Sequence, residues 1–443
     1  MRVIVIGGGA VGLCAAEALS ARGCEVTVCE RDRCGAGASA GNAGWITPSL
    51  AAPVPGPGVI RESLRWLLDP SGPLWIRPAP SAELVGWIAR FVAHCRGGPY
   101  RRGMIALQRA AARAGLAFDA LAARGVEFEQ HNDPLVFPAF DPVELDQLWQ
   151  MIDDLRAAGS PQGLERLSAG EIRAVEPALG EDVLGGLIAH GEGRVRPEVF
   201  TAGVHRALEA RGVPVLENMP ITSLSPAGRE WLVNSQTGSE PADAVVIAAG
   251  VASAKLLADH RVRLPIAAAK GYSRTYAPHP SGPRQALYLE GPKVAISVFE
   301  EGVRVSGTLE LGARSLALSP RRLRAITGAA QEALPGWRMP PRPRDWAGMR
   351  SLSPDGLPYI GPVPGLDGVH LATAHGTLGI TLAPLTGELL TRMLVDGAGN
   401  ELLGPFNPAR AIRGGQKRKA CTPRSSPTST PIWPSITMPW PPT

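Results

Sequence analysis

Residues 2–30, "RVIVIGGGAVGLCAAEALSARGCEVTVCE", decide the fold class. The run from Val3 to Ile6 is continuously apolar, as is typical of a strand buried inside a parallel sheet. Glycines follow, then residues 13–21 have a helix-forming composition, and Gly23 is placed to end that helix. "EVTVCE" is a second strand. The order of strand, glycine turn, helix and strand predicts a parallel-sheet nucleotide-binding domain.

The glycine turn fits the spacing G-x-G-x-x-G, with Gly7, Gly9 and Gly12 at the three glycine positions and Ala10 and Val11 between the last two. In this motif the first glycine allows a tight turn and the second lets a pyrophosphate approach the backbone. The third lets the helix pack closely on the strand. The helix N-terminus then faces the phosphates.

Glu30 ends the second strand, where a carboxylate suits the hydroxyls of a ribose. The alternative is an ordinary glycine-rich turn with no ligand. The position of these glycines, after a strand and at the start of a helix, favours the nucleotide-binding interpretation. The dinucleotide could be NAD or FAD. FAD is favoured because the chain breaks into "SAGNAGWITPS" instead of repeating the first unit. A buried strand, "VVIAAG" (245–250), returns only about 200 residues later, so an insertion splits the domain.

Composition excludes several classes of protein. The 443 residues suffice for two to three domains, and 44% hydrophobic with 19% charged residues is globular. The net charge of +5 comes from six basic residues between Arg410 and Arg424. Without them, 39 basic residues face 40 acidic ones, so we expect no nucleic-acid partner.

The six cysteines match neither a zinc pattern nor a small disulfide scaffold, and we expect Cys14 and Cys29 to be buried. A reduced, cytoplasmic protein fits best, with a peripheral place on the inner face of the membrane left open. The N-terminus runs into glycines instead of a cleavage site, so we expect no signal peptide. The sequence contains no apolar run of 18 or more residues, so we expect no membrane-spanning helix.

Outside the segments of the nucleotide-binding domain, the sequence predicts a second kind of structure. Residues 59–91 carry Trp66, Trp75 and Trp87 among leucines and arginines, which predicts amphipathic helices. Core or cavity-covering helices are favoured over membrane-surface ones. Segments from 263 to 310 alternate, as in an antiparallel sheet. Further helices are predicted over 100–124, 141–158 and 316–334, and a disordered tail from about 413.

Several stretches together resemble one family. "TVCERDRCGAGASAGNAGWITPSLAAPVPGPG", "AKGYS" (269–273), "VSGTLEL" (305–311), "AGMRSLSPDGLPYIG" (347–361) and "AHGTLGITLAPLTGELL" (374–390) occur in the order of the bacterial D-amino-acid dehydrogenases of the small-subunit type. These enzymes are part of the FAD-dependent D-amino-acid oxidase superfamily. The resemblance spans roughly residues 1–410 and is loose through 100–190.

The resemblance implies an α/β fold, in which a Rossmann-like FAD-binding domain is split in sequence. An α+β substrate domain would be built on a mixed or antiparallel sheet. We expect the FAD-binding domain to comprise 1–60, 191–262 and 345–410, the substrate domain 61–190 and 263–344, and the tail 411–443.

The resemblance also implies roles for individual residues at the cofactor. The loop from Ser39 to Gly44 would pass the pyrophosphate and the flavin ring, Ile221 would offer backbone groups to the adenine, and the loop after His375 would meet the pyrimidine end of the flavin. The expected FAD-binding residues are Gly7, Gly9, Ala10, Val11, Gly12, Glu30, Arg31, Ser39, Ala40, Asn42, Ala43, Gly44, Ile221, Ala249, Gly250, Gly376, Thr377, Leu378 and Gly379. No metal is expected.

Arg350, at the end of a predicted strand, is either a solvated surface charge or an anion clamp. The resemblance implies that it binds the substrate carboxylate. The candidate catalytic or substrate-contacting residues are Arg350, His375, Tyr272 and Tyr288. For His375 a hydrogen-bonded structural role is favoured over acid–base work, and Lys270 is expected on a surface loop. Ile380, Leu385 and Thr386 depart from the family pattern near the flavin.

The expected activity is FAD-dependent oxidative deamination of D-amino acids, with a quinone, an electron carrier or oxygen as the acceptor. One alternative is a D-hydroxyproline, proline-like, sarcosine or glycine oxidoreductase on the same fold. A flavin-binding subunit without catalysis and a plain NAD-dependent dehydrogenase are rivals of other kinds.

Overall fold

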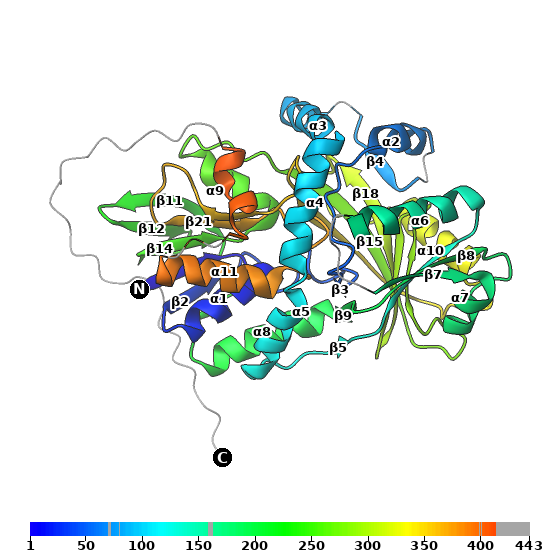
Figure 1. Ribbon diagram of the computed structural model, residues 1–443. Coiled ribbons are helices and arrows are strands. Elements are labelled where there is room, and N and C mark those ends of the chain that lie inside the picture. The colour runs from blue at the N-terminus through cyan, green and yellow to red at the C-terminus, as the bar shows by residue number, and fades with distance from the viewer. Residues whose placement is uncertain (70–71, 79, 158–162, 398, 400, 413–443) are drawn as a thin grey trace, which may run out of the picture.

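The computed structural model describes residues 1–412, apart from 70–71, 79, 158–162, 398 and 400. Two large sheets stand side by side, and helix α4 (Gly97–Ala111) lies between them (Figure 1). Ala106 and Leu107 of α4 pack into the core of the first sheet, whereas Met104 packs into a core of the second. This helix therefore links the two halves of the molecule.

Within the described residues, the first sheet has six strands in the order β10-β2-β1-β14-β21-β20. All neighbours run parallel except β20, which is antiparallel to β21. In this architecture the carboxyl ends of the parallel strands share one edge, where ligands bind. The strands are β1 (Arg2–Ile6), β2 (Glu25–Cys29), β10 (Val215–Leu216), β14 (Ala244–Ile247), β20 (Tyr359–Pro362) and β21 (Val369–Thr373).

Strand β1 is buried on both faces, as its apolar run predicts. Val3 and Val5 face α1 (Ala10–Ala21), α8 (Pro197–Ala210) and α11 (Ala383–Asp396), whereas Ile4 and Ile6 face the opposite core. That opposite core lies under α9 (Ser253–Ala258) and a small sheet of β11 (Ile221–Ala227), β12 (Glu230–Ser235) and β13 (Ser239–Ala242). The α1 and α11 backbones approach closely at Gly387, where a Cβ would crowd the carbonyl oxygen of Cys14.

The second sheet, of nine strands in the described chain, has the order β19-β15-β18-β17-β16-β6-β8-β7, with β4 paired to β18. Most pairs are antiparallel, but β16 with β6 and β18 with β4 are parallel. The strands are β4 (Leu74–Ile76), β6 (Leu135–Ala139), β7 (Leu164–Ser168), β8 (Gly185–Ala189), β15 (Ala267–Tyr276), β16 (Ala286–Leu289), β17 (Val294–Phe299), β18 (Gly302–Leu311) and β19 (Arg344–Leu352). The predicted fold class, a split parallel-sheet domain with a mixed-sheet partner, is thereby confirmed.

The remaining elements cover these sheets or connect them, and α10 packs on β15, β17 and β18. No helix among the described residues is long and apolar enough to cross a membrane. The remaining helices are α2 (Val59–Leu68), α3 (Ala82–His94), α5 (Ala114–Ala123), α6 (Pro142–Ala157), α7 (Ala169–Val175), α10 (Pro320–Ala333), η1 (Gly250–Ala252), η2 (Gly404–Phe406) and η3 (Pro408–Arg410). A small sheet joins β3 (Trp45–Ile46), β9 (Gly193–Val195) and β5 (Gln130–His131).

Two expected domain boundaries need correction. Strand β19 pairs with β15 along its whole length, so residues 345–352 are part of the second sheet and not of the FAD-binding domain. The expected tail begins too early, because Ile412 is 5% exposed and packs in the core under the small β11–β13 sheet. The remainder of the tail, 413–443, lies outside the described residues. Cys14 and Cys29 are buried, as predicted.

Candidate functional site

The glycine turn between β1 and α1 forms one end of the site. Gly7 has a φ of +114°, and a Cβ there would lie 2.5 Å from the carbonyl oxygen of Ala248. A Cβ on Gly12 would overlap the carbonyl oxygen of Gly7, so the close packing of helix on strand needs glycine. Gly9 is open, because its Cβ would come no closer than 3.5 Å to Ser39 Oγ, and it gives α1 no side-chain cap. The positive end of the α1 dipole is therefore available to a phosphate.

Glu30 follows β2 directly, and backbone amides hold its carboxylate beside the glycine turn. Its Oε2 accepts the N–H of Gly8 at 2.7 Å, and its Oε1 accepts the N–H of Asp32 at 2.9 Å. Arg31 lies differently: its side chain is 68% exposed and pairs with Asp32. The structure thus brings Glu30 to the turn and leaves Arg31 on the surface.

Two segments from distant parts of the chain complete this end of the site. Met219 donates its backbone N–H to the carbonyl oxygen of Glu30 at 2.8 Å, which brings Ile221 and the start of β11 beside the end of β2. Ala249 and Gly250 follow β14, the neighbour of β1, so they lie next to the glycine turn. Gly250 has a φ of +55° and begins η1.

The 39–44 loop runs from this turn toward the second sheet. Ser39 Oγ accepts the N–H of Ala10 at 3.1 Å, which ties the loop to the start of α1 beside the half-buried Val11. Asn42 Oδ1 accepts the N–H of Gly44 at 2.8 Å. Such a side-chain turn fixes a loop without a strand partner.

Two side chains from the second sheet hold the same loop by its carbonyl oxygens. Arg304 of β18, only 1% exposed, donates from Nη1 to Ala40 O at 3.0 Å and Asn42 O at 2.8 Å. Ser297 of β17 donates from Oγ to Ala43 O at 2.7 Å. The loop is therefore fixed from both sheets at once.

The loop that joins β21 to α11 passes along the other side of the site. Ala374 and Gly376 have φ values of +61° and +60°, so the chain turns sharply twice. Gly376 donates its N–H to Ser351 O at 3.1 Å, and Leu378 donates to His375 O at 2.9 Å. These bonds dock the loop against the end of β19.

His375 lies inside this loop and is 6% exposed. Its Nε2 is 3.0 Å from Oγ1 of Thr386 on α11. Burial lowers the pKa of His375 to about 3, so the imidazole is neutral at neutral pH. A neutral, hydrogen-bonded ring agrees with a structural role, and Thr386, one of the departures from the family pattern, supplies the partner.

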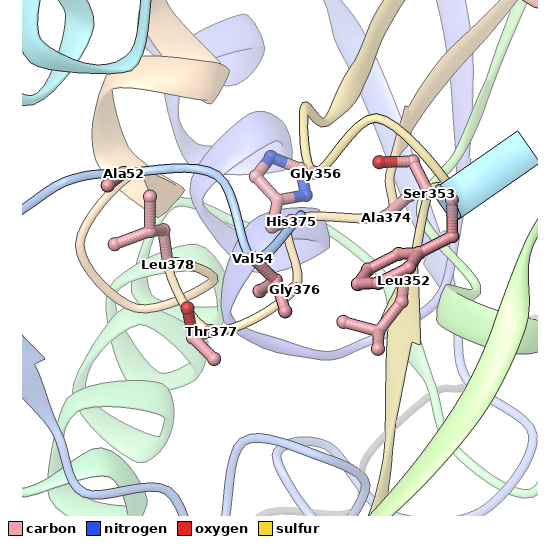
Figure 2. A pocket seen from close by; sticks show the side chains of 11 residues that line it. Ala52, Val54, Leu352, Ser353, Gly356, Ala374, His375, Gly376, Thr377 and Leu378 are labelled. Atoms are coloured by element: carbon pink, nitrogen blue, oxygen red, sulfur yellow. The ribbon is translucent and has the colours of Figure 1, made fainter. Parts of the chain in front are cut away.

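A pocket opens between this loop, the 50–56 segment and β19 (Figure 2). Phe91 of α3 closes one wall, so α3 acts as a cover for the pocket. Gly379 follows directly after the lining residues, and a Cβ on it would lie 3.8 Å from the Cβ of His375. The lining residues are Ala52, Val54, Phe91, Leu352, Ser353, Gly356, Ala374, His375, Gly376, Thr377 and Leu378.

Arg350 lies on β19 on the same face as Leu352, which lines the pocket. Its Nη1 donates to Thr308 O at 3.3 Å, and a Cβ on Gly271 would lie 2.8 Å from the guanidinium carbon. Burial lowers the pKa of Arg350. Throughout the described chain, no carboxylate lies within ion-pair distance of this half-buried cation. A buried charge without a counter-ion is costly, which points to an anionic ligand.

A β-bulge presents the oxygen that Arg350 contacts. The register of β15 against β18 shifts between Lys270 and Tyr272, and Thr308 in this bulge has a φ of +66°. Left-handed backbone at a β-branched residue is strained, and bulges and strain of this kind concentrate at functional sites.

Tyr288 lies close enough to Arg350 for their charges to interact. Burial raises the pKa of Tyr288, and the nearby cation of Arg350 acts in the opposite direction. The ring packs edge-on against Trp45 at 5.7 Å and against Phe137 at 5.6 Å. Trp45 O also accepts from Thr381 Oγ1 at 2.8 Å, which links these rings to the loop before α11.

Tyr272 is not in this group. In the β15–β19 register Gly271 faces Gly348 on the Arg350 side, so Tyr272 points to the opposite face. There its hydroxyl donates to Glu310 at 3.0 Å beneath α10. The expectation that Tyr272 contacts substrate is therefore corrected. Lys270, expected on a surface loop, is instead 4% exposed within β15 on that same far face.

The residues gathered here fit FAD. No Cβ narrows the space at Gly9 of the glycine turn, Glu30 lies beside that turn, and the 374–379 loop offers backbone groups near the pocket. Arg304 and its ion-pair partner Glu198 of α8 were missed from the sequence. The sequence feature that could have identified Arg304 is an arginine at a core-facing position of the alternating strand "GVRVSGTLEL".

Comparisons with known proteins agree with this geometry. The DAO family, described as FAD dependent oxidoreductase, matches residues 2–393. A D-amino acid dehydrogenase of Rhodopseudomonas palustris (strain HaA2) is 32% identical over 392 residues, covering 86% of this chain and 91% of that protein. Glycine oxidase from Geobacillus kaustophilus superposes with a TM-score of 0.72 at 23% identity, covering 93% of this chain and 100% of that one. Iminodiacetate oxidase from Chelativorans sp. BNC1 superposes with a TM-score of 0.70 at 22% identity, covering 92% of this chain and 99% of that one.

Proposed function

The chain belongs to the DAO family of FAD dependent oxidoreductases, and we propose that it oxidises D-amino acids at the α-carbon. FAD, when bound, supplies the hydride acceptor, the flavin N5. As the hydride leaves the α-carbon, the lone pair of the neutral amine forms a C=N bond. The resulting iminium takes up water and releases ammonium, which leaves a 2-oxo acid.

The observation that carries this proposal is the guanidinium of Arg350, which has no carboxylate within ion-pair distance among the described residues and belongs to the strand that leads into the pocket. Leu352, two residues further along the same face of β19, lines the pocket, so the Cα atoms of Arg350 and Leu352 are about 7 Å apart. The guanidinium itself lies against Gly271 and Thr308. A guanidinium grips a carboxylate with two parallel hydrogen bonds. Two fixed atoms orient the rest of an amino acid, which aims its α-hydrogen at the cofactor.

The side chains around Arg350 suit hydride transfer without acid–base catalysis. His375 is neutral, because burial lowers its pKa to about 3, and the raised pKa of Tyr288 keeps that phenol protonated. Ala52, Val54 and Leu378 make the pocket wall largely apolar, which favours a neutral amine over an ammonium. These residues would orient the substrate and exclude water from the α-carbon.

An anaerobic flavin-reduction screen tests the proposal. The purified, FAD-loaded chain is mixed with D- and L-amino acids, D-hydroxyproline and sarcosine, and the oxidised flavin absorbance is followed. We expect bleaching by D-amino acids with an ordinary side chain and not by their L-enantiomers. Bleaching only by D-hydroxyproline or sarcosine would replace the proposed substrate class, and no bleaching by any of them would favour a flavin-binding subunit without catalysis.

The electron acceptor is part of the same proposal. We propose that the chain is a dehydrogenase that passes electrons to a quinone or an electron carrier, and that it associates peripherally with a membrane. The apolar side chains of Ile60, Leu64 and Leu67 are exposed on α2 and are available for such contact. Reoxidation of the reduced flavin by a soluble quinone should outpace reoxidation by oxygen, and faster reoxidation by oxygen would identify an oxidase instead.

A further inference from the structure

A cysteine, a histidine and a glutamate meet next to the glycine turn, outside the group around Arg350. Cys34 comes from the loop after β2, His205 from α8, and Glu217 directly after β10. One potential ligand atom from each of the three lies within 4.8 Å of the others. All three are half-buried, so an ion could reach them from solvent.

We propose that Cys34, His205 and Glu217 form a binding site for a divalent, thiophilic metal ion, Zn²⁺ in the first place. Thiolate, imidazole and carboxylate together are donors that zinc accepts, and three protein ligands with a water in the fourth position complete a tetrahedron. The ligand atoms need to close by only about 1 Å to reach the spacing of such a site.

One nitrogen of His205 supports a missing ligand independently of this clustering. Its Nε2 is buried and, among the described residues, has no hydrogen-bond partner. Buried polar atoms without a partner are rare and call for an unseen water or ion. A carboxylate oxygen of Glu209, one turn along α8, lies 3.5 Å from this nitrogen and adds negative charge beside the cluster.

The local charge also favours a cation. The carboxylates of Glu217, Glu30 and Glu209 all lie near enough to Cys34 for their charges to act on it. Three carboxylates therefore place negative charge beside the proposed site. A divalent ion would be drawn to this negative potential and would stabilise the thiolate.

The backbone around Cys34 is already fixed in place for such a site. Its N–H donates to Glu217 Oε1 at 2.7 Å, and the N–H of Gly35 donates to Gly8 O at 2.8 Å. A Cβ on Gly35 would collide with Thr201 of α8, one turn before His205. An ion here would therefore clamp the loop after β2 to α8, directly beside the turn that faces FAD.

Calorimetric titration of the metal-stripped, FAD-loaded chain with Zn²⁺ tests the proposal. We expect one equivalent to bind, and Cys34→Ser, His205→Ala and Glu217→Gln each to weaken binding by about tenfold or more, since loss of outer-shell partners alone costs 10–100-fold. Cys24→Ser, which alters a half-buried cysteine outside the cluster, should leave the affinity unchanged.

Thermal melting supplies a second readout that needs no substrate. Zn²⁺ should raise the Tm of the wild type and of Cys24→Ser, because an ion that binds only the folded state stabilises it, and should not raise the Tm of His205→Ala. Binding that survives all three ligand variants, or no binding to the wild type, would overturn the site. Since neither measurement uses an amino acid, failure here leaves the proposed oxidation untouched.

Discussion

At the residue scale, Glu30 is the most direct test of the dinucleotide assignment. Its carboxylate is held by the N–H groups of Gly8 and Asp32, and we propose that it accepts hydrogen bonds from the ribose of FAD. Glu30→Ala should weaken FAD binding by about 1.5–3 kcal/mol, the worth of a hydrogen bond to a charged group. FAD titration of the apoprotein measures this, with Glu25→Ala at the exposed start of β2 as the control. Unchanged affinity in Glu30→Ala would show that another group holds the adenosine.

His375 predicts a pH dependence of stability at the same scale. Its pKa is lowered from 6.5 to about 3 in the folded chain, so the unfolded state binds the proton more readily. The contribution of His375 is therefore fully present above pH 6.5 and is lost as the pH falls from 6.5 toward 3.

Urea unfolding between pH 4 and pH 7 measures this contribution. The free energy of unfolding should fall less steeply toward acid in His375→Gln than in the wild type, because glutamine keeps a hydrogen bond to Thr386 but takes up no proton. Parallel curves for the two proteins would mean that the ring can be protonated inside the fold.

At the element scale, the β15–β19 pair determines where Arg350 points. A Cβ on Gly271 would meet the guanidinium at 2.8 Å, so Gly271→Ala should displace it. We expect a higher KM for the amino acid and unchanged FAD content. Gly328→Ala in α10, where a Cβ meets nothing within 4 Å, is the matched control and should behave as the wild type. Wild-type KM in Gly271→Ala would place the carboxylate elsewhere.

Local signals predicted some elements well and left others open, for physical reasons. The turn at Gly7 and the strand ending before Glu30 follow from contiguous residues, and both are found as predicted. Which side of the second sheet Tyr272 faces depends on its register with a strand about 75 residues away, and a shift of one residue would reverse it. The loop held by Arg304 likewise depends on pairing between distant segments.

At the scale of the whole molecule, the Pro-, Ser- and Thr-rich composition beyond residue 413 predicts no contribution to the core. The described chain closes with Arg410 paired to Asp355 and with Ile412 buried in the core under the β11–β13 sheet. A chain ending at residue 413 should keep the Tm and turnover of the full protein.

A chain ending at residue 410 provides the comparison, since it lacks the buried isoleucine. It should be less stable by about 1.5–3 kcal/mol, the free energy of burying such a side chain. Differential scanning fluorimetry of the three lengths measures both effects. A clearly lower Tm for the chain that ends at residue 413 than for the full protein would show that residues beyond 413 contribute to the fold.

The central claim is that Arg350 binds the carboxylate of a D-amino acid whose α-hydrogen is transferred to FAD. Arg350→Lys keeps the charge but loses the planar fork, so KM should rise and kcat should fall through misalignment. Arg350→Ala should lower kcat/KM by an amount that corresponds to a loss of about 2–5 kcal/mol in transition-state stabilisation, as removal of one partner of a buried charge pair does.

Anaerobic flavin reduction by the best D-amino acid from the screen, in the wild type, Arg350→Lys and Arg350→Ala, tests this claim most directly. FAD content, read from the flavin spectrum, should be equal in all three. The corresponding amine without a carboxylate should reduce the wild type and Arg350→Ala at similar rates, because it has nothing for the guanidinium to bind. Reduction of the flavin of Arg350→Ala by the D-amino acid at the wild-type rate would contradict the account.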